Sequence, residues 1–469
     1  MSKIFNRIRK SGTAMVLACV VAQGPASAEV LSDAMASAYV NSGLLEQNRA
    51  LLRAADEDVA IALSALRPII DWSASFSRNW IDRNQGFGRN SVDTSTGAIG
   101  LSGTQLLYDG GASKLNIRAA QETVLASRET LRSIEQTVLF NAVQAYMNLV
   151  RANEFLSLAQ NNRRVLEEEL RASRDRFEVG EVTRTDVALS ESRLAAADSN
   201  VAIARGDVVT AQAIFVQVVG RPAGNLAPSP NIPGRPDTID RAQAISIQNH
   251  PDIKSLQRQI SAADITVNVA RATLLPSVRL GLEAGVSNTF DNEVYSDTVT
   301  ASVSVSQRIY QGGALTSQVR RAIASRDALR GNLLTTQRAV EQEVAAAFVA
   351  LEVARATISS TEERVRAAQV AFDGIREEAR LGSRTTLDVL TAEQELLDAQ
   401  AALISAQADR YVAAYRLVAA QGLLSAERLG LNVPLYDVSA YYNAVKNAPS
   451  LQSKQGRELD RVLRAIGKE

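Results

Sequence analysis

The feature that most constrains this 469-residue chain is an internal repeat at an offset of 202 residues. The nonapeptide VGEVTRTDV at 179–187 returns as LGSRTTLDV at 381–389. The same offset relates the YDGG motif at 108–111 to YQGG at 310–313. The register is unbroken through Gly220 and its counterpart in the second half. Since each copy is far longer than a solenoid repeat, the chain is predicted to consist of two similar halves.

Each Gly-Gly pair is followed by a long segment that favours a single helix. The two segments, 112–178 and 314–380, contain no proline. In the second segment, Val344, Leu351 and Ile358 recur every seven residues, which is typical of coiled-coil packing. At 1.5 Å per residue, a helix of this length measures about 100 Å. A compact globular domain has no room for it, so each half is predicted to contain an extended helical hairpin.

Alternating apolar and polar residues predict a pair of strands ahead of each hairpin, within 68–108 and within 276–310. In the second pair, every other residue over 278–286 is apolar. Two interpretations are open: strands that pack on a soluble core, and strands with one face to lipid and the other to a polar lumen. Small polar residues on the second face, with Trp72 and Trp80 near strand ends, favour the membrane interpretation.

Strands that span a membrane would require an oligomer. No stretch after the N-terminus has 18 consecutive apolar residues, so no transmembrane helix is predicted. Four strands per chain cannot close a barrel, since closed barrels need about eight or more. An open sheet in a bilayer would expose unpaired backbone groups to lipid. If the strands span a membrane, several copies of the chain must therefore share one barrel.

The first 28 residues have the pattern of a secretory signal peptide. Four basic residues and no acid precede an apolar segment at 13–22 and a small-x-small cleavage site at Ala26-Ser27-Ala28. Removal of these four basic residues takes the formal net charge from 0 to −4. It also removes Cys19, the only cysteine. Lipidation of Cys19 is the rival interpretation, but the apolar residues that follow it favour cleavage after Ala28.

The composition offers little for catalysis, cofactors or nucleic acid. The mature chain has one histidine, His250, and no cysteine, so no Cys-His or Ser-His pair and no metal cluster is predicted. The Gly-Gly pairs lack a following Lys-Ser/Thr and are interpreted as turns rather than phosphate loops. The formal net charge gives no basic surplus for nucleic acid. We therefore expect no enzyme, no cofactor and no nucleic-acid partner.

Together, these motifs resemble those of TolC-type outer-membrane efflux and secretion channels. The similarity rests on the leader, the two halves, Tyr-x-Gly-Gly at each strand-to-helix junction and Gly-x-x-Thr-x-x-Asp-Val at each helical turn. It spans essentially the whole mature chain. It implies an α+β membrane protein in which an outer-membrane β-barrel, shared between protomers, continues into a long α-helical coiled-coil barrel.

The resemblance also implies an organisation and a set of partners. We expect a homotrimer in the outer membrane of a Gram-negative bacterium, extending into the periplasm and exporting proteins or small molecules. The implied partners are a periplasmic adaptor and an inner-membrane transporter, either an ABC transporter or a proton-driven one. The start of the tail, 430–437, is similar to that of members paired with type I secretion systems. The predicted divisions are a signal peptide at 1–28, a first repeat at 29–225 with its hairpin at 112–220, a second repeat at 226–430 with its hairpin at 314–422, and an equatorial tail at 431–469.

For the periplasmic gate, the resemblance implies a ring of Asp388 in the pore. It also implies a tie between Arg384 and Asp186 of a neighbouring protomer. Since Arg384 lies four residues before Asp388, the two are predicted to share a helix face. Simple helix capping is the alternative role for both aspartates. The residues expected to dock the adaptor are Gly180, Gly382, Thr183 and Thr385.

Two positions depart from the family pattern, and one alternative covers the whole chain. Thr391 stands where the family's prototype has a second pore aspartate, so a single acidic ring is expected. Ala379 stands where the prototype has a constraining tyrosine. The alternative for the chain is a periplasmic coiled-coil adaptor, which would explain the heptad hairpins but not the strands at the far end of both.

Overall fold

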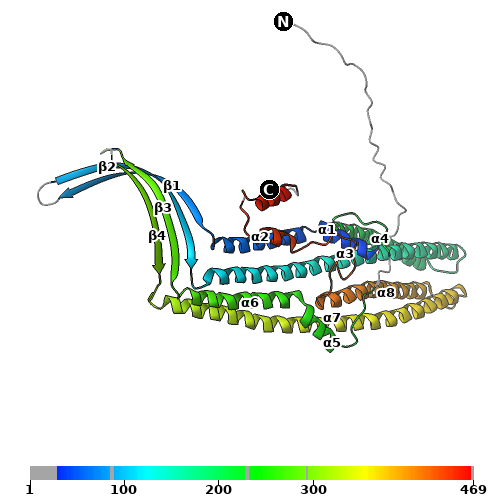
Figure 1. Cartoon of the computed structure of the whole chain (residues 1–469). Helices are drawn as coiled ribbons and strands as arrows, with labels where there is room; N and C mark the ends of the chain where they lie inside the picture. The colour runs from blue at the N-terminus through cyan, green and yellow to red at the C-terminus, as the bar shows by residue number, and fades with distance from the viewer. Residues whose placement is uncertain (1–28, 85–88, 228–231, 292–293, 451, 466–469) are drawn as a thin grey trace, which may run out of the picture.

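The computed structural model shows an elongated molecule, with a β-sheet at one end and two helical hairpins that extend away from it (Figure 1). The predicted leader, with Cys19, lies outside the described residues. The structure describes residues 29–84, 89–227, 232–291, 294–450 and 452–465.

The described elements alternate helices and strand pairs in the order that the two-half repeat predicts. They are α1 (Leu31–Asn41), α2 (Gly43–Ser64), β1 (Ile69–Asn84), β2 (Arg89–Tyr108), α3 (Ala112–Glu178), α4 (Arg184–Val219), α5 (Ile239–Asn249), α6 (Pro251–Ala272), β3 (Ser277–Thr289), β4 (Val294–Ser306), α7 (Ala314–Arg380), α8 (Thr386–Ala420), α9 (Ala440–Val445) and α10 (Lys454–Ala465).

The four strands form one antiparallel sheet in the order β1-β2-β3-β4. Apolar side chains of the sheet face outward in the single chain, since 76% of Trp72 and 87% of Val299 are exposed. The soluble-core interpretation of the strands is therefore wrong. The sheet has two open edges, because β1 and β4 each pair on one side only within the described chain. The register aligns one apolar residue from each strand across the sheet: Trp72, Leu101, Ala284 and Val299.

The two long helices, α3 and α7, have the bounds that the sequence predicts, and each contains 67 residues. Both begin after a Gly-Gly pair whose second glycine is left-handed, with φ of +85° at Gly111 and +82° at Gly313. Glycine adopts this conformation at little cost, so the chain passes from strand to helix within a short turn. The heptad residues Val344 and Leu351 are buried where α7 packs on α8, which confirms the predicted coiled-coil row.

Shorter helices extend along each long one. α2 and α4 both pack on α3, and α6 and α8 both pack on α7 (Figure 1). Because α6 and α8 also contact α3, the two hairpins lie side by side. Both hairpin turns are therefore at the end of the molecule opposite the sheet.

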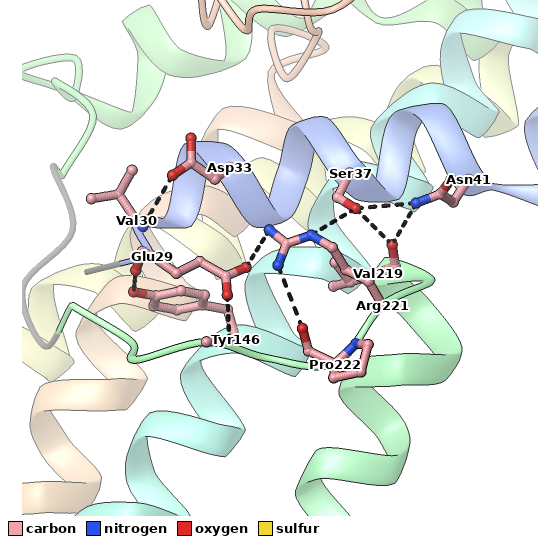
Figure 2. Close-up of polar contacts among 10 residues, drawn as sticks. Glu29, Val30, Asp33, Ser37, Asn41, Tyr146, Val219, Arg221 and Pro222 are labelled. Atoms are coloured by element: carbon pink, nitrogen blue, oxygen red, sulfur yellow. Dashed lines mark hydrogen bonds and ion pairs between the residues drawn. The ribbon is translucent and has the colours of Figure 1, made fainter. Parts of the chain in front are cut away.

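A polar network fixes the start of the described chain against the end of α4 and the middle of α3 (Figure 2). The carboxylate of Glu29 accepts hydrogen bonds from the guanidinium of Arg221 at 2.6 Å and from the amide of Gly224 at 2.7 Å. The hydroxyl of Tyr146 lies 2.9 Å from the carbonyl oxygen of Glu29 and 2.7 Å from that of Ala227. Since Tyr146 is fully buried, this network joins three segments distant in sequence.

The segment after Leu431 packs back on the outer helices. The hydroxyl of Tyr441 donates a hydrogen bond to the carboxylate of Glu57 on α2 at 2.7 Å. The guanidinium of Arg128 on α3 lies over the ring of Tyr442 at 5.4 Å. The tail is thereby attached to the middle part of the bundle rather than to the hairpin turns.

By length and composition, α4 and α7 each contain a window apolar enough to cross a membrane. This criterion averages hydropathy over a window and is looser than a run of 18 consecutive apolar residues, so it does not overturn the expectation that the chain has no transmembrane helix. A spanning helix needs only about 20 residues, whereas α7 has 67 and packs on α6 and α8. We interpret both windows as apolar faces of the helical bundle.

Candidate gate and docking site at the helical turns

Each hairpin turns at a glycine in the left-handed conformation. The φ angle is +80° at Gly180 and +79° at Gly382. A Cβ at either position would have no described atom within 4 Å, so backbone conformation rather than space selects glycine. The amide of Glu181 donates to the carbonyl of Arg176 at 2.9 Å, and the second turn has the same bond at 3.0 Å. This hydrogen bond satisfies one of the free carbonyls at the helix C-terminus.

The helix after each turn begins with a reciprocal capping box. The carboxylate of Asp186 accepts from the amide of Thr183 at 2.9 Å and from its hydroxyl at 2.7 Å. Asp388 accepts from the same two groups of Thr385 at 3.0 and 2.9 Å. The hydroxyl of Thr183 holds the pKa of Asp186 below its ordinary value, and the amide of Thr385 does so for Asp388. Capping is therefore confirmed for both aspartates, which stay ionised at neutral pH.

Arg384 lies in the turn itself, before the N-cap residue Thr385. The prediction that it shares a helix face with Asp388 is therefore wrong, because α8 begins only after Arg384. Its Nε donates to the carboxylate of Glu378 at 2.8 Å. Within the described part of one protomer, the structure gives Arg384 no contact with Asp186. The tie to a neighbouring protomer stays a prediction, and Glu378 is a partner that the sequence did not reveal.

The turns also present exposed apolar side chains that the sequence analysis missed. Val179 is 70% exposed and Leu381 is 79% exposed. The two occupy equivalent positions in the repeat, directly before the turn glycines. That equivalence is the sequence signal that could have identified them.

The two positions that depart from the family pattern have local roles. The hydroxyl of Thr391 donates to the carbonyl of Leu387 within α8 at 2.8 Å. Ala379 is buried in an apolar cluster with Phe372 of α7 and Val389 of α8. At the position where the prototype has a tyrosine, this chain therefore has a small residue that packs between α7 and α8.

A second charged cluster lies higher in the hairpins, between α3, α7 and α8. Arg376 of α7 pairs with the buried carboxylate of Glu169 on α3 at 3.2 Å. Glu393 of α8 is beside them and only 6% exposed. The sequence analysis missed this cluster. The sequence feature that could have identified it is Glu393 itself, which interrupts an apolar row of α8 between Val389 and Leu396.

Comparisons with known proteins agree with this architecture. The profile of the outer membrane efflux protein family matches residues 35–221 and 244–423. Outer membrane efflux protein BepC of Brucella suis biovar 1 (strain 1330) is 37% identical over 439 residues, which cover 92% of this chain and 94% of BepC. Outer membrane protein TolC of Escherichia coli (strain K12) is 26% identical over 425 residues, covering 86% and 84%. The structure of the CmeC outer membrane channel of Campylobacter jejuni is similar with a TM-score of 0.72 at 19% identity, covering 96% of this chain and 99% of CmeC.

The two segments matched by the family profile correspond to the two halves of the repeat. The solved channel shares the combination of long helical hairpins and membrane strands, which confirms the expected fold class. The outer-membrane location and the role of an exit duct follow from the same matches. The chain therefore belongs to the outer membrane efflux protein family.

Proposed function

We propose that three copies of this chain form one channel-tunnel, and that it works with a periplasmic adaptor and an inner-membrane transporter. The observation that carries the proposal is the sheet, which has an exposed apolar row and two open edges. Open sheet edges are strongly unfavourable in lipid, because their backbone groups have no hydrogen-bond partners there. Pairing of β1 with β4 of the next copy removes them. Three copies then supply more than the roughly eight strands that a closed barrel needs.

The helical bundle supports the same assembly. Apolar side chains on α4 and α7 are exposed in the single chain, among them Ile203, Val209 and Val353. They lie away from the contact between the two hairpins, so neighbouring copies can cover them. A soluble coiled-coil adaptor is not favoured, because it would leave the strand residues Trp72 and Val299 in water.

The adaptor is proposed to dock on the hairpin turns. Val179 and Leu381 supply exposed apolar contacts at equivalent positions of the two hairpins. The predicted docking residues hold the shape of this surface: each glycine sets the left-handed turn and each threonine caps the next helix. These residues are Gly180, Gly382, Thr183 and Thr385.

The gate is proposed at the same turns. Glu378 holds the guanidinium of Arg384 through Nε. The two terminal nitrogens of Arg384 have no hydrogen-bond partner among the described residues, and we propose Asp186 of a neighbouring copy for them. Three Asp388 carboxylates around a narrow opening would attract cations, since low-dielectric walls focus their field.

The assembly is tested by mass measurement in detergent together with conductance in planar bilayers. A trimer that conducts supports the proposal, and a water-soluble monomer contradicts it. A photo-crosslinker in place of Leu381 tests docking in cells and should capture an adaptor. The matched control is Ile61 on α2, which is also exposed and apolar but distant from the turns. Equal capture of the adaptor from both positions would contradict docking at the turns.

A further inference from the structure

Glu393 is a buried carboxylic acid in the lower part of the bundle. Both of its carboxyl oxygens are buried, and neither has a hydrogen-bond partner among the residues that the structure describes. It follows the apolar residues Val389, Leu390 and Ala392 on α8, which pack into the clusters around Phe372 and Leu166. An ionised carboxylate in such a place, without a donor, is strongly disfavoured.

Charged residues from the three other hairpin helices face Glu393. They are Glu169 of α3, Arg376 of α7 and Arg193 of α4. Arg376 is paired with Glu169 at 3.2 Å, which ties the second hairpin to the first. Of the two arginines, Arg376 is therefore the one for which Glu393 and Glu169 compete, and in this arrangement Glu169 holds it.

The repeat supplies an internal comparison for this competition. Arg174 and Glu191 occupy the positions of the first hairpin that are equivalent to Arg376 and Glu393. There the arginine and the glutamate form an exposed ion pair at 2.6 Å. The same two residue types at the same spacing thus bind each other in one hairpin. In the other hairpin, the arginine has turned to α3 instead.

We propose that Arg376 is a latch with two positions, and that ionisation of Glu393 draws it from Glu169 and loosens the contact between the hairpins. The proposal rests on the proposed function as a gated channel. In the latched position Arg376 pairs with Glu169 while Glu393 is neutral. In the released position Arg376 pairs with Glu393, as Arg174 pairs with Glu191 in the first hairpin.

The direction of the pH dependence follows from burial. Burial raises the pKa of Glu393 from 4.5 to about 7, and the charge of Glu169 acts in the same direction. The latched arrangement is therefore fully favoured below about pH 4.5 and loses this advantage as the pH rises through about 7. Each pKa unit corresponds to a tenfold change in the equilibrium, so a pKa difference between 4.5 and about 7 corresponds to a roughly 300-fold change in the ratio of released to latched hairpins.

The latch is tested by distance measurement between spin labels at the two hairpin turns, at Glu181→Cys and Ser383→Cys. Removal of the leader leaves the mature chain without a native cysteine, and dilution with unlabelled chains isolates the distance within one protomer. The distance distribution should shift to longer values between about pH 5 and about pH 9. Glu393→Gln, which resembles the neutral acid, should hold the short distances at all pH values. Glu169→Gln should give the long distances even at low pH.

Two control variants make the result specific. Glu191→Gln removes the equivalent carboxylate of the first hairpin, and Glu395→Gln removes an exposed one from α8. Neither should change the pH dependence. The latch is overturned if Glu393→Gln keeps the pH dependence of the parent, or if Glu191→Gln abolishes it. Bilayer recordings distinguish failure of the latch from failure of the proposed channel function. A trimer that conducts without this pH dependence contradicts only the latch. A chain that never conducts contradicts the channel function.

Discussion

One chemical change, glycine to alanine, should have opposite effects at two places near the same turn. Gly382 has a φ of +79°, whereas Gly374 lies inside α7. At neither position would a Cβ have a described atom within 4 Å, so packing contributes to neither change. Gly382→Ala should destabilise the turn by about 1 kcal/mol, because a left-handed conformation costs an L-residue roughly 1–2 kcal/mol. Gly374→Ala should stabilise α7 by about 0.5–1 kcal/mol, because glycine costs this much in a helix.

The effects can be measured by hydrogen exchange on the trimer in detergent. The amide of Ser383 bonds to the carbonyl of Glu378 across the turn at 3.0 Å. A loss of about 1 kcal/mol lowers its protection roughly fivefold in Gly382→Ala. Gly382→Asn should lose less, because asparagine tolerates the left-handed region. Unchanged protection in Gly382→Ala, or reduced protection of α7 in Gly374→Ala, would show that backbone conformation does not determine the turn.

Four further predictions concern the gate, the buried polar network around Tyr146 and the cleavage of the signal peptide. Arg384→Ser should raise single-channel conductance, since it removes the proposed tie between tips, and an unchanged conductance would place the gate elsewhere. Asp388→Asn should weaken cation selectivity in bilayers while the mass of the trimer stays the same; a selectivity equal to the parent's would leave Asp388 only its capping role. Tyr146→Phe should destabilise the protein by about 1–2 kcal/mol, because buried carbonyls lose their donor; thermal unfolding that matches the parent would contradict this. N-terminal sequencing of the mature protein should begin at Glu29, and a lipid-modified cysteine at the terminus would refute cleavage there.

The long helices and their turns could be predicted because their signals are local. A glycine with positive φ, a threonine cap and an aspartate three residues later specify the end of one helix and the start of the next. This is why α3 and α7 end where the sequence indicates. The strands could be located by alternation, but their environment could not. That required the register, which aligns the apolar residues on one exposed face.

The partners of the arginines could not be predicted, because they depend on contacts between elements. Arg384 is near several acidic residues in the sequence, and only the turn geometry selects Glu378, six positions earlier. For Arg376 the spacing favours Glu393, as the first hairpin demonstrates with Arg174. The structure instead pairs Arg376 with Glu169, because α3 of the other hairpin lies within reach.

The difference between the two halves has a geometric cause that extends to the proposed trimer. Within one protomer α8 packs on α3, so Glu393 meets the other hairpin, whereas Glu191 on α4 stays exposed. In a ring of alternating hairpins, α4 would meet α7 of the next copy in the same manner. The position on α7 equivalent to Glu169 is Ala371, which has no carboxylate to draw Arg174 from Glu191. In the proposed trimer, a pH change would therefore act on the latch between the two hairpins of each protomer, while the Arg174–Glu191 pair within the first hairpin stays in place.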